Sequence, residues 1–164
     1  MTRPTFTVAG GSMGESSVPL PGGLPFSARR NHESPPVVEQ LGWRYHHIGI
    51  PTTKVQADET HLEPFGLFVS GFSASPYGIE WMRFEQDSPL PELIRTVPHV
   101  AFEVEDLDTA LEGQHVIYPP GSPSEGVRSA MIVHNGAPVE LIWFRKPMPS
   151  PGEPEVPLRS PADA

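Results

Sequence analysis

The chain has 164 residues, a formal net charge of −9 and no cysteine. This length supports one hydrophobic core of moderate size. The negative charge argues against non-specific nucleic-acid binding, which needs a basic face, and no apolar run approaches membrane-spanning length. The lack of cysteine excludes disulfides and thiolate ligands and is compatible with a reducing compartment. We therefore expect a cytoplasmic domain with neither a nucleic-acid nor a membrane partner.

Proline is unusually abundant, with 22 residues, and much of it lies near the two ends of the chain. Residues 1–39 form a Pro/Gly/Ser-rich N-terminal extension, and residues 147–164 form a Pro-rich C-terminal tail. Both contain few large apolar residues, so neither can bury enough surface to offset its chain entropy. The structured domain is therefore expected at 40–146.

Hydrophobic patterning between the tails predicts mainly strands. Strands are expected, in chain order, at 43–50, 66–72, 78–85, 97–104, 115–120, 127–134 and 138–145. Residues 89–96 can form one or two helical turns. A clearer helix starts at Asp106 or Asp108, which can cap it, and ends at Gly113. Asn135–Gly136 is a strong hairpin signal between the last two strands.

The second half of this pattern is a β-α-β-β-β unit. The first half looks like the same unit with its helix shortened or lost between Thr53 and Pro64. The fold class is then α+β, with two tandem modules at about 43–86 and 97–145. A duplication of this kind would place equivalent strand positions together across a pseudo-two-fold axis.

A histidine and a glutamate recur at matching places in the two modules. His47 lies early in the first strand and Glu80 in the last strand of module one, while His99 and Glu140 take these positions in module two. Buried carboxylates must be paired, protonated or bound to a metal. One divalent ion bound by all four side chains accounts for these positions together. His46 alternates to the opposite face from His47 in a regular strand, so His47 is the expected ligand.

These modules resemble the vicinal oxygen chelate superfamily, which includes glyoxalase I, methylmalonyl-CoA epimerase, ring-cleaving dioxygenases, fosfomycin-modifying enzymes and bleomycin-resistance proteins. The resemblance rests on HHIGI at 46–50, PHVAFEVEDLDTAL at 98–111 and PVELIWF at 138–144, and it covers about 43–145. It implies tandem βαβββ modules that form a curved mixed sheet around a central metal cleft. The His/Glu/His/Glu set is closest in pattern to that of glyoxalase I of the bacterial kind.

The resemblance implies one Zn, Ni, Co, Mn or Fe(II) ion held by His47, Glu80, His99 and Glu140. It also implies a small-molecule substrate that chelates the ion through two adjacent oxygens. The expected activity is that of a metal-dependent lyase or isomerase. Glu140 is the expected catalytic base, with Glu80 as its symmetric partner. An Fe(II)-dependent dioxygenase and a non-catalytic small-molecule binding or resistance protein are the alternatives.

Two further side chains are candidates for substrate binding. Tyr45 is expected on the same face as His47, where its hydroxyl could reach a substrate oxygen. Arg128 begins a strand and could bind an anionic substrate, although core packing for Tyr45 and a surface ion pair for Arg128 are the commoner roles. Trp81 and Trp143, at matching positions, are assigned to packing against helices or a partner subunit, which leaves a homodimer open.

Overall fold

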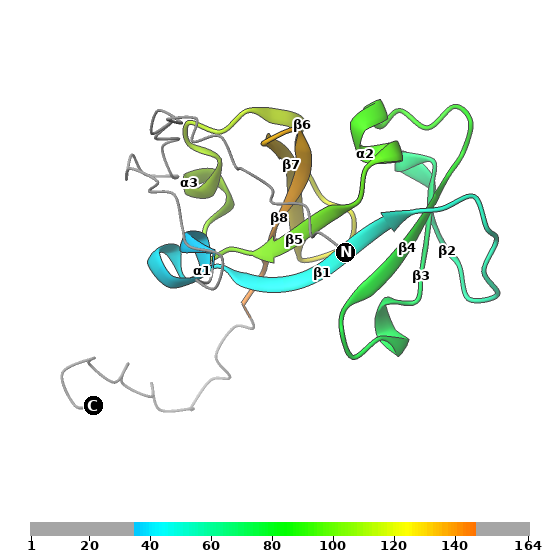
Figure 1. Cartoon of the computed structure of the whole chain (residues 1–164), viewed down its shortest axis with the longest axis horizontal. Helices are drawn as coiled ribbons and strands as arrows, with labels where there is room; N and C mark the ends of the chain where they lie inside the picture. Colours follow the sequence, from blue (N-terminus) through cyan, green and yellow to red (C-terminus); the bar gives the residue numbers. More distant parts are fainter. Residues whose placement is uncertain (1–34, 147–164) are drawn as a thin grey trace, which may run out of the picture.

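The computed structural model describes residues 35–146, so the two terminal tails predicted at 1–39 and 147–164 fall largely outside the described residues. The fold is α+β, as predicted, and is built on one curved mixed sheet of eight strands (Figure 1). The strands follow the order β2-β3-β4-β1-β5-β8-β7-β6 across the sheet.

The predicted strands are all present, and one short strand, β2, was not expected. The strands are β1 (Arg44–Pro51), β2 (Thr60–Leu62), β3 (Leu67–Ser70), β4 (Ile79–Phe84), β5 (His99–Glu103), β6 (Val116–Gly121), β7 (Val127–His134) and β8 (Ala137–Phe144). The α-helices are α1 (Pro36–Leu41), α2 (Glu92–Thr96) and α3 (Leu107–Leu111), and the 3₁₀ turns are η1 (Glu63–Phe65) and η2 (Phe72–Ala74). Helix α1 lies across residue 40, where the domain was expected to begin.

The sheet order has an internal symmetry that relates the two halves of the chain. Strands β1 and β5 pair antiparallel at the centre, β4 runs parallel to β1, and β8 runs parallel to β5. Strand β3 then pairs with β4 in the same antiparallel way as β7 with β8, and β2 and β6 form the two edges. Exchanging β1–β4 with β5–β8 therefore maps the sheet order onto itself.

Local sequence features explain the ends of several elements. The Asp106 side chain accepts a hydrogen bond from the Thr109 backbone N–H and so caps α3. Asn135 and Gly136 have φ angles of 50° and 76°, as the predicted two-residue hairpin turn between β7 and β8 requires. Helix α3 has no counterpart among the described residues between β1 and β2, which agrees with the lost helix expected in the first module.

Each face of the sheet carries its own apolar cluster, because successive residues of a strand point to opposite faces. Ala130 and Ile132 of β7 join α1 and α3 in one cluster, which also contains Trp43 and Leu141. Met131, between them, joins a second cluster with α2, β3 and β4. The second face is the one that bears the candidate site.

No helix among residues 35–146 is both long enough and apolar enough to cross a membrane.

Candidate metal centre

Two rows of side chains cross the middle of the sheet and bring the predicted ligands together. Residues that face each other across paired strands share one face of the sheet. Glu80 pairs with Gly49, and Gly49 pairs with His99, which forms the first row.

In the second row His47 pairs with Ala101, and Ala101 pairs with Glu140. The internal symmetry of the sheet exchanges the two rows. Each row therefore supplies one histidine and one glutamate, with a small residue between them. The matched sequence positions have matched places in the structure.

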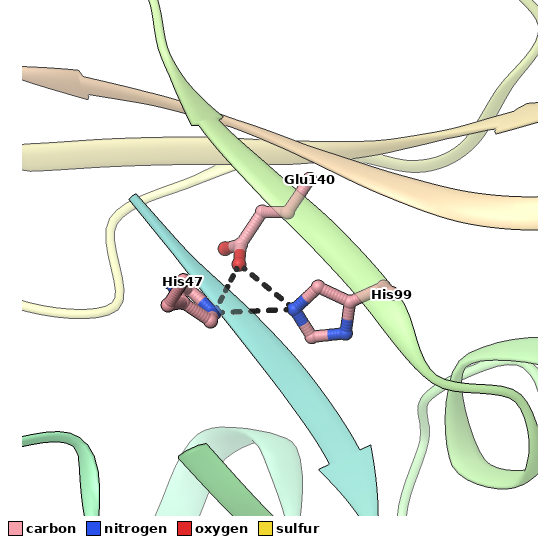
Figure 2. Close-up of side chains that lie close together, drawn as sticks. All are labelled: His47, His99 and Glu140. Atoms are coloured by element: carbon pink, nitrogen blue, oxygen red, sulfur yellow. Dashed lines mark hydrogen bonds and ion pairs between the residues drawn. The ribbon is translucent and has the colours of Figure 1, made fainter. Parts of the chain in front are cut away.

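Three of the four side chains converge closely (Figure 2). The His47 Nε2 atom lies 3.2 Å from the Nε2 atom of His99, and the Glu140 Oε2 atom lies 3.4 Å from each of these nitrogens. Metal–ligand bonds of about 2.0–2.1 Å with tetrahedral or octahedral angles separate donor atoms by about 2.9–3.4 Å. The spacing of the three donors therefore fits one transition-metal ion, and these three residues could hold one.

Glu80 lies in the same cavity but outside this close group. Its Oε2 atom is 3.6 Å from the Nε2 atom of His47. The four predicted ligands therefore form a close group of three, called the trio below (His47, His99 and Glu140), and one neighbouring carboxylate, Glu80.

The two histidines of the trio are deeply buried, and Glu140 is mostly buried. The side chains of His47 and His99 are 6% and 1% exposed, and that of Glu140 is 17% exposed. Burial is the main reason why the pKa of His47 falls to about 4. The carboxylate of Glu140 acts to raise this pKa, whereas the neighbouring His99 and His46 lower it further. His47 is therefore neutral near pH 7, as a metal ligand must be.

The two carboxylates differ electrostatically. Burial acts to raise the pKa of Glu140, but hydrogen bonds from His99 and Ser129 and the nearby imidazoles outweigh it, so the net shift is downward. For Glu80, burial and then the charge of Glu140 raise the pKa to about 7, although His99 opposes them. Glu140 is the carboxylate that the site keeps ionised.

His46 does not lie where strand alternation predicts. Its ring lines the same cavity as His47, because the register of β1 against β5 shifts between Tyr45 and His47. Such a bulge places two consecutive side chains on one side of a strand. The expectation that His46 points to the opposite face was therefore wrong.

The Nδ1 atom of His46 lies 2.8 Å from the Nδ1 atom of His47. If Nε2 of His47 holds a metal ion, its Nδ1 carries the proton and donates it to His46. The ring of His46 is fixed in turn by Phe72, on which it stacks with the ring centroids 5.0 Å apart. The contact was not predicted because a bulge leaves no mark in the alternation of residue types.

The two candidates for substrate binding lie elsewhere. Tyr45 is 51% exposed, its hydroxyl donates to the backbone oxygen of Tyr77, and it is not among the residues that line the cavity. The bulge that turns His46 inward thus corrects the face expected for Tyr45. Arg128 donates to the carboxylate of Asp108, 3.0 Å away, and does not line the cavity either.

Gly49 has a direct part in the geometry of the site. A Cβ atom at this position would lie 2.1 Å from Cε1 of His99, so the imidazole fits over the strand only because glycine is there. Ala101, which is fully buried, is the corresponding small residue beside His47. The sequence carried this signal, because a small residue stands two positions after each of the two histidines.

Comparisons with known proteins bear on the fold. No family model matches the chain, and no curated protein does. Among solved structures, the chain is similar to a hypothetical protein, BH1468, from Bacillus halodurans C-125. The TM-score is 0.50 at 17% sequence identity, and the match covers 65% of this chain and 97% of that one. At this identity the similarity shows a shared fold and nothing about activity.

The Gly49→Ala variant should lose metal affinity on the order of 10–100-fold, because the new methyl group displaces the His99 ring. The φ angle of Gly49 is not positive, so alanine fits its backbone. Calorimetric titration of the metal-free protein with Co²⁺ measures the loss. Gly121→Ala is the control, since nothing lies within 4 Å of a Cβ atom there. Equal affinity in the two variants would contradict the packing argument.

His46→Phe should weaken metal binding by roughly tenfold, because phenylalanine keeps the stacking on Phe72 but cannot accept the His47 proton. His46→Asn should retain more of the affinity, since its side-chain oxygen can replace Nδ1 as the acceptor. The measurement is Co²⁺ affinity together with the Nδ1–H proton signal of His47 in the loaded protein. Unchanged affinity in both variants would show that His46 does not orient His47.

Glu80→Gln should change how the stability of the metal-free protein depends on pH. A folded-state pKa of about 7, raised from 4.5, means that Glu80 stabilises the fold fully below the lower value and loses this contribution as the pH rises through the upper one. The uncharged glutamine removes that loss, so the melting temperature should fall less between about pH 5 and about pH 8. Glu125→Gln, at an exposed position, controls for removing one charge. Parallel curves for Glu80→Gln and wild type would refute the expectation.

Proposed function

We propose that this protein is a metal-dependent enzyme of the vicinal oxygen chelate type, a glyoxalase-like lyase or isomerase. The observation that carries the proposal is the spacing of His47, His99 and Glu140, whose donor atoms lie 3.2–3.4 Å apart on the two central strands and β8. The symmetric sheet and the position of the trio at its centre support the family resemblance. A bound divalent ion would act as a Lewis acid on two adjacent oxygens of a small substrate.

The trio and Glu80 would have different tasks. His47, His99 and Glu140 would hold the ion. The hydrogen bond that His47 donates to His46 and the one that Glu140 accepts from Ser129 would orient their ligand atoms. Glu80 lines the same cavity but lies outside the close group, with its Oε2 atom 3.6 Å from the Nε2 atom of His47. A carboxylate placed there can remove a proton from the carbon beside a bound carbonyl and return it.

This division modifies the expectation from the sequence, which gave the part of the base to Glu140. Geometry favours Glu80, because a ligand carboxylate that contacts two imidazoles would have to leave both of them to reach a substrate proton. Glu80 has one such contact, at 3.6 Å. Its use as a fourth ligand before substrate binds is compatible with this role.

Hydrogen exchange distinguishes the proposed roles of Glu80 and Glu140. With metal bound, Glu80→Gln should lower proton–deuteron exchange beside the carbonyl of 2-oxo or 2-hydroxycarbonyl compounds by roughly 10²–10⁴-fold, because an amide cannot accept the proton. It should retain most of the metal. Glu140→Gln should lose metal first, as should His47→Ala and His99→Ala.

Elemental analysis and exchange in deuterated water measure these effects on the full chain. Exchange that persists in Glu80→Gln but disappears in a metal-loaded Glu140→Gln would restore Glu140 as the base. Failure of the wild type to bind Zn²⁺, Ni²⁺, Co²⁺, Mn²⁺ or Fe²⁺ would overturn the proposal as a whole.

A dioxygenase is the second candidate, and the composition of the close group favours it. Two histidines and one carboxylate with open positions form the ligand set that non-haem Fe(II) oxygenases use. Oxygen uptake by the Fe(II)-loaded protein with catechols, without proton exchange in the carbonyl panel, would favour this reaction. A cytoplasmic location and a homodimer remain predictions.

A further inference from the structure

The cavity beside the candidate metal centre has two chemically different ends. It has a volume of about 250 Å³, and the trio and Glu80 line one part of it. The remainder is lined mainly by apolar side chains from both halves of the chain, among them Leu67, Met82, Leu90, Ile94 and Met131. A ligand that reaches the metal with one end must therefore place its other end against apolar atoms.

No lysine or arginine lines this cavity in the described part of the chain. The strands that form its walls carry three arginines, and each is paired with a carboxylate. Arg44, at the start of β1, binds Glu103. Arg83 of β4 forms a two-pronged hydrogen bond with the carboxylate of Glu59, at 2.8 and 2.6 Å. Arg128 of β7 binds Asp108. Arg83 alternates with Met82, and Arg128 with Val127 and Ser129, which line the cavity, so both arginines point to the other face.

Charge therefore discriminates among ligands. An anionic group on the part of a ligand away from the metal would lie among apolar side chains without a counter-ion. Burial of an unpaired charge is strongly unfavourable, whereas an apolar group gains from leaving water. The arrangement selects against carboxylates and phosphates on that part of the substrate.

From these observations we propose that the site takes a small, neutral substrate with an apolar body and two adjacent oxygens at one end. This inference rests on the proposed function for the chelating end, and on the cavity wall alone for the neutral, apolar body. It revises the expectation that Arg128 receives an anionic substrate. Large anionic conjugates do not meet the requirement, because their charge has no partner on this wall.

Three hydroxamates with the same chelating head test the proposal. Acetohydroxamate has a methyl body, benzohydroxamate a phenyl body, and 4-carboxybenzohydroxamate a phenyl body with an added negative charge. With the Co²⁺-loaded full chain, benzohydroxamate should bind at least about tenfold more tightly than acetohydroxamate, because its ring adds apolar area to the burial. The carboxylated probe should bind at least about tenfold more weakly than benzohydroxamate. Equal or tighter binding of the carboxylated probe would overturn the proposal.

A positive charge introduced at the rim of the cavity gives an independent test of the proposal. Ser124 lines the cavity and is exposed, so a lysine there should fold normally. Ser124→Lys should strengthen binding of the carboxylated probe by roughly twofold to fivefold and leave benzohydroxamate unchanged, and Ser124→Gln should change neither. An equal gain for both probes would contradict a specific lack of positive charge.

The same titrations with the metal-free protein separate the two proposals. Without the ion all three probes should bind more weakly, but benzohydroxamate should still bind more tightly than the carboxylated probe. A protein that binds no metal yet keeps this order would refute the proposed function and leave the inference about the wall intact. A protein that binds metal but shows no preference would do the reverse.

Discussion

The antiparallel pairing of β1 with β5 is the constraint on which the site depends. Its register sets His47 opposite Ala101 and His99 opposite Gly49, so each imidazole lies over a small residue of the neighbouring strand. A register change of one residue would turn a histidine to the other face. Because β4 and β8 flank this pair in parallel, the same register also decides where Glu80 and Glu140 project.

The symmetry of the backbone is not carried through to the side chains. Both modules supply one histidine and one glutamate, yet only the carboxylate of module two lies within the close group. Ser129 and the two imidazoles contribute hydrogen bonds or charge that favour the ionised form of Glu140, while burial and then the charge of Glu140 disfavour the ionised form of Glu80. Two equivalent positions in a duplicated fold have thereby acquired different chemical character, which is what a division between ligand and base requires.

Most of the fold was predictable, because strand alternation, the capping aspartate of α3 and the Asn135–Gly136 turn are local signals. The convergence of His47, His99 and Glu140 followed from the repeat. The bulge beside His46 was not predictable, since it arises from the pairing of β1 with β5 and leaves no pattern in residue types. The faces assigned to His46 and Tyr45 were wrong for that single reason, and β2 escaped notice because three residues are too few to show a period.

The lining of the cavity gives information about the substrate that neither the sequence repeat nor the set of metal ligands gives. A trio of two imidazoles and one carboxylate is compatible with several reactions, so the metal ligands alone do not select a substrate. In the proposal made above, the rest of the cavity wall does, because its apolar side chains come from β3, β4, α2 and β7 and none of them is charged. The proposed selection of the substrate would thus be separable from metal binding. The trio lies on β1, β5 and β8, whereas apolar side chains of the wall come from β3, β7 and α2 and, beside Glu80, from β4. Substitutions in β3, β7 and α2 therefore leave the strands that carry the trio unchanged.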